Sequence, residues 1–302
     1  MIRALLAGTI LLIAFGAVAA AETPVERGAK QAALADSRRV VAVGGSVTEI
    51  VYALGLEDRL VAVDSTSLYP AAVGALPNVG YMRQLSAEPI LALDPQLVLA
   101  IEDSGPPTAL DQLRDAGVPV VLVPDTPSPR GVIEKIRVVA AALGVDEAGA
   151  RLAARVEAQL SVVGKAFGDV DERPRVLFLL SVGNGRVPLA AGRETSAAGI
   201  IELAGGVNVF DDFESYKPLS PEAAVAGAPD VLLITDRSLG LLGGMESLLE
   251  IPEIALTPAG RNGRVVTMDS LLLLGFGPRT AEAAVALGKQ LHPAVVLPGA
   301  VR

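Results

Sequence analysis

The chain has 302 residues, a formal net charge of −9, a single histidine and no cysteine. The lack of cysteine excludes disulfide bonds and a lipid-anchored cysteine, and the acidic balance disfavours nucleic acid as a partner. Once a leader is removed, the remaining length of about 280 residues exceeds one ordinary hydrophobic core and suits two lobes.

The N-terminal residues are typical of a secretory signal peptide, which we expect to span residues 1–21. Arg3 gives a positive start to an apolar run that ends in three alanines suited to cleavage. The run is short for a transmembrane helix of about 20 residues. Beyond it, apolar runs such as Val231–Ile234 and Leu271–Leu274 have the length of buried strands.

Strands and helices alternate over residues 38–145, which we expect to form an N-terminal lobe. Strands are predicted at 39–43, 60–63, 97–100 and 118–123, the last interrupted by Pro119, and Ser46 is expected to cap the first helix. This alternation is the pattern of an α/β fold.

The middle of the chain keeps a helical pattern from Pro129 to Phe167, apart from a break near Gly144. We therefore predict an inter-lobe helix over 146–168, about 30 Å long at 1.5 Å per residue. A second α/β lobe is expected over 172–302. A long helix between two such lobes would act as a rigid spine.

An internal repeat supports two lobes of similar build. Residues 85–99 align without a gap on residues 219–233, and both segments read Leu-Ser-x-Glu, then a helix, a proline and a buried strand. The serines, Ser86 and Ser220, are each expected to cap their helix. The predicted fold class is therefore α/β, with two similar Rossmann-like lobes, a spine helix and a cleft between the lobes.

Few side chains of this chain could hold a metal-bearing ligand. The single histidine, His292, falls at a predicted helix C-terminus, where an imidazole can meet free carbonyls. A tyrosine is one of the residues that hold haem iron, and Tyr69 lies in a loop directly after a strand. No nucleophile elbow, phosphate loop or histidine–carboxylate cluster occurs, which indicates a binding module rather than an enzyme.

Four runs carry a resemblance to known proteins, namely Thr66–Pro70, Leu76–Glu88, Ala191–Thr195 and Tyr216–Ser220. Together with secretion, two similar lobes and a spine helix, they resemble the class III periplasmic binding proteins, and within that class the periplasmic hemin-binding proteins. The resemblance covers essentially the whole mature chain. It implies a periplasmic, monomeric protein that captures haem b in the inter-lobe cleft and delivers it to an ABC permease of the inner membrane.

The resemblance also implies site residues. Tyr69 matches the family's iron ligand, and a cleft-wall aromatic that only stacks is the alternative. The candidates for the haem pocket and the haem propionates are Tyr81, Met82, Arg83 and Arg237. A structural role for Tyr81 and a solvated loop position for Arg83 remain open. Some relatives use a second-lobe histidine as a further ligand. The only histidine here, His292, falls at a predicted helix end, so we expect Tyr69 as the sole protein ligand of the iron and one haem per chain.

Two glutamates, Glu88 and Glu222, occupy equivalent positions in the repeat. The resemblance implies that they dock onto arginines of the permease. The alternative is helix-start electrostatics, worth about 0.3–1 kcal/mol each, and the two roles are compatible. For the whole chain, the open alternatives are a same-fold carrier of a ferric siderophore or cobalamin, and a secreted sensor or interaction protein without a transport role.

Overall fold

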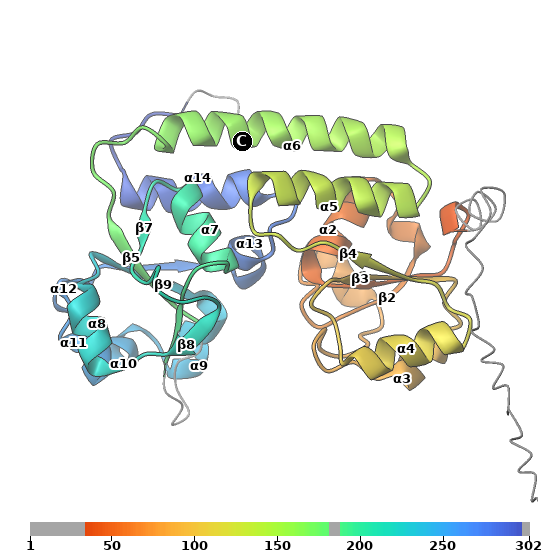
Figure 1. Ribbon diagram of the computed structural model, residues 1–302, viewed down its shortest axis with the longest axis horizontal. Coiled ribbons are helices and arrows are strands. Elements are labelled where there is room, and N and C mark those ends of the chain that lie inside the picture. Colours follow the sequence, from red (N-terminus) through yellow and green to blue (C-terminus); the bar gives the residue numbers. More distant parts are fainter. Residues whose placement is uncertain (1–33, 181–187, 298–302) are drawn as a thin grey trace, which may run out of the picture.

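The computed structural model describes residues 34–180 and 188–297, so the predicted signal peptide lies outside the described residues. Two α/β lobes lie beneath a layer of long helices (Figure 1). The strands are β1 (Val40–Val43), β2 (Leu60–Val63), β3 (Leu97–Ile101), β4 (Val120–Val123), β5 (Arg175–Leu179), β6 (Leu189–Ala191), β7 (Val207–Asn208), β8 (Tyr216–Pro218), β9 (Val231–Thr235) and β10 (Val265–Met268).

The helices of the first lobe and of the top layer are α2 (Gly45–Ala53), α3 (Ala87–Leu91), α4 (Pro107–Asp115), α5 (Pro129–Ala142) and α6 (Asp146–Phe167). Those that follow are α7 (Ser196–Leu203), α8 (Pro221–Gly227), α9 (Asp236–Leu242), α10 (Met245–Leu249), α11 (Pro252–Ala255), α12 (Pro258–Arg261), α13 (Ser270–Leu274) and α14 (Thr280–Leu291). None of the helices within the described ranges has the length and apolar character needed to cross a bilayer.

The first sheet has four parallel strands in the order β2-β1-β3-β4. β1 is buried along its whole length and pairs with two neighbours, so that Val40 lies opposite both Leu60 and Leu97. Strands buried on both faces read as unbroken apolar runs. For this reason the strands predicted at 39–43, 60–63 and 97–100 are confirmed to within one residue at each end. The strand predicted at 118–123 begins two residues later, at Val120.

The second sheet has the order β10-β9-β5-β6-β8, with β7 also beside β5. β7, β9 and β10 run parallel within it, whereas β6 and β8 are antiparallel to their neighbours. Successive residues of β5 face opposite sides. Phe178 joins the large core that includes residues of α6 and α14, while Leu177 joins a smaller core shared with α8, α10, α11 and α12. The α/β class and the two-lobed architecture are confirmed.

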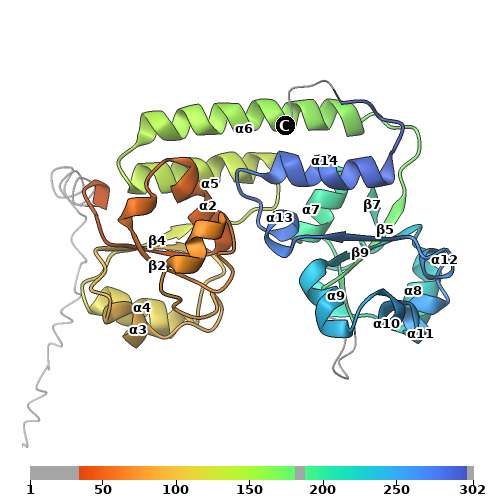
Figure 2. The same cartoon turned by 180° about the vertical axis from the view of Figure 1, so that it is seen from behind.

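The helix predicted over 146–168 is present as α6. It crosses above both lobes and packs on α5 and α14 (Figures 1 and 2). Its buried side chains Leu152, Val156, Leu160 and Val163 recur every three or four residues, which places them on one face of the helix. This apolar stripe ties the helix to both neighbours.

One predicted strand was wrong. Leu271–Leu274 forms the helix α13 instead, because Asp269 caps it and accepts a hydrogen bond from the Leu272 backbone N–H at 2.7 Å. A short apolar run does not by itself distinguish a strand from a buried helical turn.

Of the three predicted serine caps, Ser220 and Ser86 occupy the N-cap position and Ser46 does not. Ser220 accepts a hydrogen bond from the Ala223 backbone N–H at 3.1 Å, as expected for the cap of α8. Ser86 is the N-cap residue of α3, but its side chain makes no such bond. The cap predicted at Ser46 was wrong, because α2 begins one residue before it. Ser46 instead accepts a hydrogen bond from the Lys135 ammonium at 3.2 Å.

Candidate functional site

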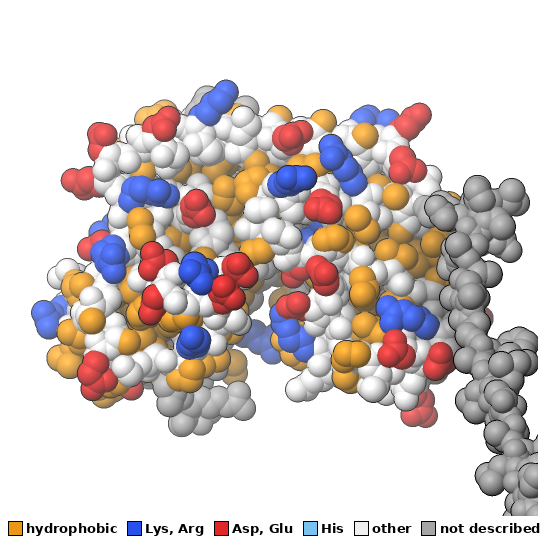
Figure 3. All heavy atoms as spheres, viewed as in Figure 1, with side chains coloured by type: hydrophobic (Ala, Val, Ile, Leu, Met, Phe, Trp, Pro, Cys, Tyr) orange, Lys and Arg blue, Asp and Glu red, His pale blue; other side chains and the backbone are white. Residues whose placement is uncertain are grey.

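A cavity of about 610 Å³ lies between the lobes, and Figure 3 shows the molecule hollowed at this place. Its walls come from segments that follow parallel strands. The first sheet contributes Gly44, Thr66, Asp103 and Asp125, and the second contributes Leu180, Arg237 and Ser270. The carboxyl ends of the strands of both sheets thus border one space, which is where open α/β sheets bind ligands.

The loop after β2 is held against the start of α2 by a buried carboxylate. Asp64 accepts hydrogen bonds from the Gly44 backbone N–H at 2.9 Å and from the hydroxyls of Thr66 and Ser67 at 2.7 and 2.8 Å. Gly45 allows the two segments to approach, since a Cβ there would lie 2.5 Å from the Thr66 carbonyl oxygen. The loop therefore presents its residues to the cavity from fixed positions.

Tyr81 and Arg83 form part of the cavity wall. Nη1 of Arg83 donates a hydrogen bond to the Tyr81 phenol oxygen at 3.0 Å, and Nη2 meets the Asp103 carboxylate at 2.9 Å. Burial acts to lower the pKa of Arg83, but its hydrogen bonds to Tyr81 and Asp103 outweigh this and raise it. The phenol oxygen, the atom that could bind a metal, thus has a permanent cation within hydrogen-bond distance.

Tyr216 lines the cavity from the second lobe. It begins β8, and its ring packs near Phe178 with centroids 6.4 Å apart. Burial raises the pKa of the Tyr216 phenol to about 12, although the charge of Arg83 and a hydrogen bond with Thr195 act to lower it. Without a bound metal, this phenol is a neutral hydrogen-bond donor at physiological pH.

The segment around Tyr216 contains two strained residues. Glu194 and Ser215 both line the cavity, and their φ values of 59° and 64° lie in the left-handed region. Such residues cost about 1–3 kcal/mol each and persist where the surrounding structure holds them, often at binding sites. Here the β6–β8 ladder continues into this segment, where the Ser215 N–H donates to the Arg193 carbonyl at 3.0 Å and the Gly192 N–H donates to the Ser215 carbonyl at 2.8 Å.

The other pocket candidates, Met82 and Arg237, also lie in the cavity wall. Met82 is buried, and its sulfur lies 4.0 Å from the Thr66 hydroxyl. Arg237 is exposed in the first turn of α9. Among residues 34–180 and 188–297, no carboxylate forms an ion pair with its guanidinium, which leaves this charge free for a ligand.

Tyr69 is not one of the residues that line the cavity, although its neighbour Leu68 is. The tyrosine is 46% exposed, and the guanidinium carbon of Arg279 lies 3.6 Å from the centroid of its ring. The residue expected from the sequence to hold iron therefore lies beside the cavity, with its ring face covered. Its role as a ligand stays a prediction.

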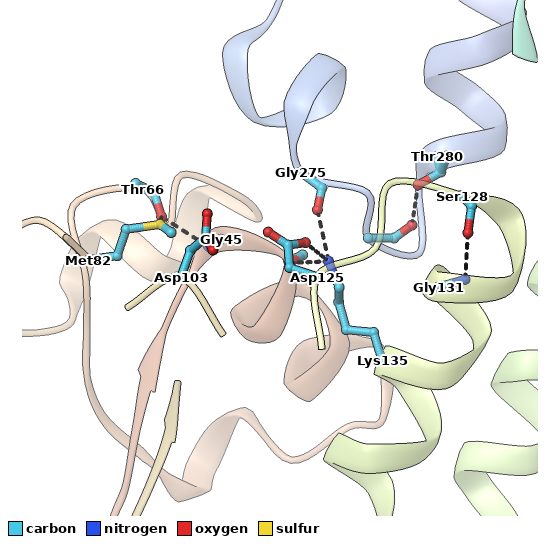
Figure 4. Close-up of polar contacts among 12 residues, drawn as sticks. Gly45, Thr66, Met82, Asp103, Asp125, Ser128, Gly131, Lys135, Gly275 and Thr280 are labelled. Carbon is cyan, nitrogen blue, oxygen red and sulfur yellow. Dashed lines mark hydrogen bonds and ion pairs between the residues drawn. The ribbon is translucent and has the colours of Figure 1, made fainter. Parts of the chain in front are cut away.

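Behind the cavity wall lies a buried cation that the sequence analysis did not single out. The ammonium of Lys135 donates to Asp125 at 2.7 Å, to Ser46 at 3.2 Å and to the Gly275 carbonyl at 3.4 Å (Figure 4). Burial lowers the pKa of Lys135, and the charge of Asp125 acts in the opposite direction. The sequence contained a signal, because Lys135 shares the apolar face of its helix with Val139.

The two predicted docking glutamates lie away from the cavity. Glu88 and Glu222 are exposed in the first turns of α3 and α8. These helices lie on different lobes but on the same side of the molecule, opposite α6 (Figures 1 and 2). Each lobe thus has one of the two exposed glutamates in a helix on that side.

His292 is the C-cap residue of α14, and its Nε2 lies 3.2 Å from the Gly205 carbonyl oxygen. The imidazole thus meets a carbonyl just after the end of α7, rather than one of its own helix. Within the described part of the chain, no group of three or more histidine, cysteine, aspartate or glutamate side chains could hold a metal ion.

Comparisons with known proteins agree with this geometry. The family described as periplasmic binding protein matches residues 40–272. The periplasmic heme-binding protein RhuT from Roseiflexus sp. RS-1, solved in apo form, is 45% identical with a TM-score of 0.82, over 85% of this chain and 99% of that chain. The periplasmic heme-binding protein BhuT, solved in complex with two hemes, is 43% identical with a TM-score of 0.80, again over 85% of this chain and 99% of that chain.

A more distant relative is described as binding another ligand. A vitamin B12-binding protein from Vibrio parahaemolyticus is 29% identical over 254 residues, which are 82% of this chain and 86% of the relative. The family match extends over the strands of both sheets that border the cavity. The chain therefore belongs to the periplasmic binding protein family, a non-enzymatic component of transport.

Proposed function

We propose that the protein captures haem in the cavity between its lobes and delivers it to an ABC permease. The observation that carries this proposal is Tyr81 in the cavity wall, with the Arg83 guanidinium 3.0 Å from its oxygen. The solved heme-binding relatives at 43% and 45% identity support it. The transported ligand is haem b, bound as one molecule per monomeric chain.

The chemistry of ferric iron favours Tyr81 over Tyr69 as the ligand. A free phenol has a pKa of about 10, so a phenolate at neutral pH needs a cation close to its oxygen. Arg83 lies at the oxygen of Tyr81, and bound iron would supply a second cation. The guanidinium beside Tyr69 instead covers the ring face. Tyr69 remains the alternative ligand.

The rest of the cavity wall suits a porphyrin. Haem combines a broad apolar ring with two carboxylates and an iron atom. Apolar side chains for the ring come from both lobes, namely Leu68, Met82, Ile101, Leu271 and Leu274. The free guanidinium of Arg237 suits one propionate, and the neutral phenol of Tyr216 can donate a hydrogen bond to a carboxylate.

A hemin titration of the parent protein beside Tyr81→Phe and Tyr69→Phe tests this proposal. We expect the parent to develop a tyrosinate-type ferric spectrum at one equivalent and Tyr81→Phe to lose it, with affinity reduced by about a hundredfold or more. Tyr69→Phe should behave as the parent. The reverse pattern would assign the iron to Tyr69, and a parent that binds no hemin would overturn haem capture.

Delivery to a permease is proposed to use Glu88 and Glu222. Their support is that each is exposed and that their helices, α3 and α8, lie on different lobes on the side of the molecule opposite α6. A Glu88→Ala, Glu222→Ala double variant should bind hemin normally and fail in haem uptake by cells. Glu157→Ala, an exposed position on α6, is the matched control. Normal uptake by the double variant would remove the docking assignment.

Cobalamin is the second candidate ligand, favoured by the vitamin B12-binding relative at 29% identity. A corrinoid brings its own metal ligands, so it would leave the Tyr81 oxygen without a bond to metal. Calorimetric titration with cyanocobalamin separates the two ligands. Tight binding that survives Tyr81→Phe, together with weak hemin binding, would favour the corrinoid.

A further inference from the structure

A short connector, residues 275–279, joins the lobes next to the cavity. It runs from the end of α13 to the start of α14. On one side it belongs to the second lobe, because Phe276 is buried there and a Cβ on Gly199 of α7 would lie 2.9 Å from its ring. The connector is therefore anchored in the second lobe.

The same connector also contacts the first lobe. The Gly275 carbonyl accepts a hydrogen bond from Lys135 at 3.4 Å. Gly277 lies directly against α2, where an added Cβ would be 3.2 Å from a Glu49 carboxylate oxygen and 3.4 Å from the Ser46 Cβ. Neighbouring connector residues thus contact opposite lobes.

The strongest link is the ion pair at the end of the connector. Nε of Arg279 donates to Oε2 of Glu49 at 3.2 Å, and Nη2 of the same guanidinium donates to Oε1. The side chains are 19% and 5% exposed. A two-point contact of this kind is strong and directional, and separating it would leave a buried carboxylate without its partner.

The guanidinium of Arg279 also lies on the ring of Tyr69, 3.6 Å from its centroid. Arginine stacks readily on aromatic faces through its planar, weakly hydrated cation. The ring belongs to the loop that the buried Asp64 ties to the start of α2, and the adjacent Leu68 lines the cavity. The contact therefore reaches the cavity wall.

We propose that this connector is an interlobe clamp, in which Arg279, Glu49 and Tyr69 are positioning residues that fix the width of the cavity. The clamp needs the ring face of Tyr69 and not its oxygen. It adds a second rigid link beside the cavity to the one that α6 provides above it. It acts on the empty protein and does not depend on which ligand the cavity takes.

Distances between spin labels on the two lobes test the clamp. The chain has no cysteine, so labels attach only at Asp115→Cys on α4 and Glu246→Cys on α10, two exposed positions. Without ligand, the labelled protein that carries no other substitution should give one narrow distance distribution in pulsed electron paramagnetic resonance. Arg279→Met should add a population at longer distances.

A second variant controls for misfolding of the Arg279→Met single variant. Glu49→Leu combined with Arg279→Met leaves no unpaired buried charge, and it should show the same added population. Tyr69→Phe keeps the ring face and should match the parent, whereas Tyr69→Leu should broaden the distribution. Unchanged distributions in the double variant and in Tyr69→Leu would overturn the clamp. Because no ligand is present, a failure to bind hemin would leave this result standing.

Discussion

Two tyrosine–arginine pairs lie close to the cavity, and they differ in where the cation meets the tyrosine. Arg83 donates to the oxygen of Tyr81, whereas Arg279 lies on the ring face of Tyr69. A cation at the oxygen stabilises a phenolate, which is what iron binds. A cation on the face leaves the oxygen unassisted and stabilises the packing of two segments. The same residue types thus suit a ligand-binding role in one pair and a structural role in the other.

The carboxylates behind the two arginines differ as well. Asp103, the partner of Arg83, has a side chain that is 61% exposed, while that of Glu49, the partner of Arg279, is 5% exposed. Burial raises the pKa of Glu49, and the hydrogen bond and charge of Arg279 act against that rise. If Arg83 is lost, water can solvate the exposed Asp103 carboxylate. If Arg279 is lost, water cannot do the same for the buried Glu49 carboxylate. The two pairs should therefore respond differently to loss of the guanidinium.

The largest effect is expected for Arg279→Met on stability. Breaking a buried pair by removing one partner costs about 3–5 kcal/mol, because the remaining charge is uncompensated. Urea unfolding followed by circular dichroism measures this loss. The Glu49→Leu, Arg279→Met double variant should recover most of it. A single variant as stable as the parent would mean that Glu49 is not the buried, paired carboxylate described above.

Arg83→Gln should affect hemin binding much more than folding. We expect affinity to fall by about tenfold, the size of effect usual for a partner of a metal ligand. The tyrosinate band should be weaker than in the parent at the same hemin concentration, because the Tyr81 oxygen has lost its hydrogen-bond donor.

The control for Arg83→Gln is Arg114→Gln. Arg114 forms an ion pair with Asp111 at 2.8 Å, with 42% and 64% of the side chains exposed, and it lies outside the cavity wall. This exposure is close to that of the Arg83–Asp103 pair. Equal loss of hemin affinity in both variants would remove the special role of Arg83.

Tyr216 predicts an alkaline limit to stability. Its folded-state pKa of about 12 lies above the value of about 10 for a free phenol. The unfolded chain therefore loses this proton first, so the contribution to stability is complete below pH 10 and is lost as the pH rises through 12. Unfolding measured from pH 9 to 12 should show a steeper decline for the parent than for Tyr216→Phe. Parallel declines would contradict the raised pKa.

The fold could be predicted because its signals are local. The strands β1 and β3 are buried on both faces, so their sequences, VVAV and LVLAI, are unbroken apolar runs that can be recognised without knowing their neighbours. The stripe along α6 repeats with helical period over 22 residues. The Leu271–Leu274 run failed because four apolar residues are too few to show a period, and a single capping aspartate decided the outcome.

The site could be predicted only in part, because it depends on contacts between distant residues. The loop from Tyr81 to Arg83 could be found as a motif within one segment. The pairing of Arg279 with Glu49 joins residues 230 positions apart, and no pattern along the chain marks it. Because the sequence does not reveal that contact, the position of Tyr69 in a loop after a strand favoured a role as iron ligand. Its arginine neighbour became known only from the structure.

The smallest predicted change in stability, that of Tyr69→Leu, best distinguishes the two tyrosine–arginine pairs. Tyr69→Leu removes the ring beneath Arg279 and should cost about 0.5–1 kcal/mol of unfolding free energy, the usual value of an exposed cation–π contact. Tyr69→Phe keeps the ring face, so its urea midpoint should match that of the parent. If Tyr69→Phe is as destabilised as Tyr69→Leu, the oxygen of Tyr69 contributes more than its ring does. The contrast between a structural tyrosine and a ligand tyrosine would then fail.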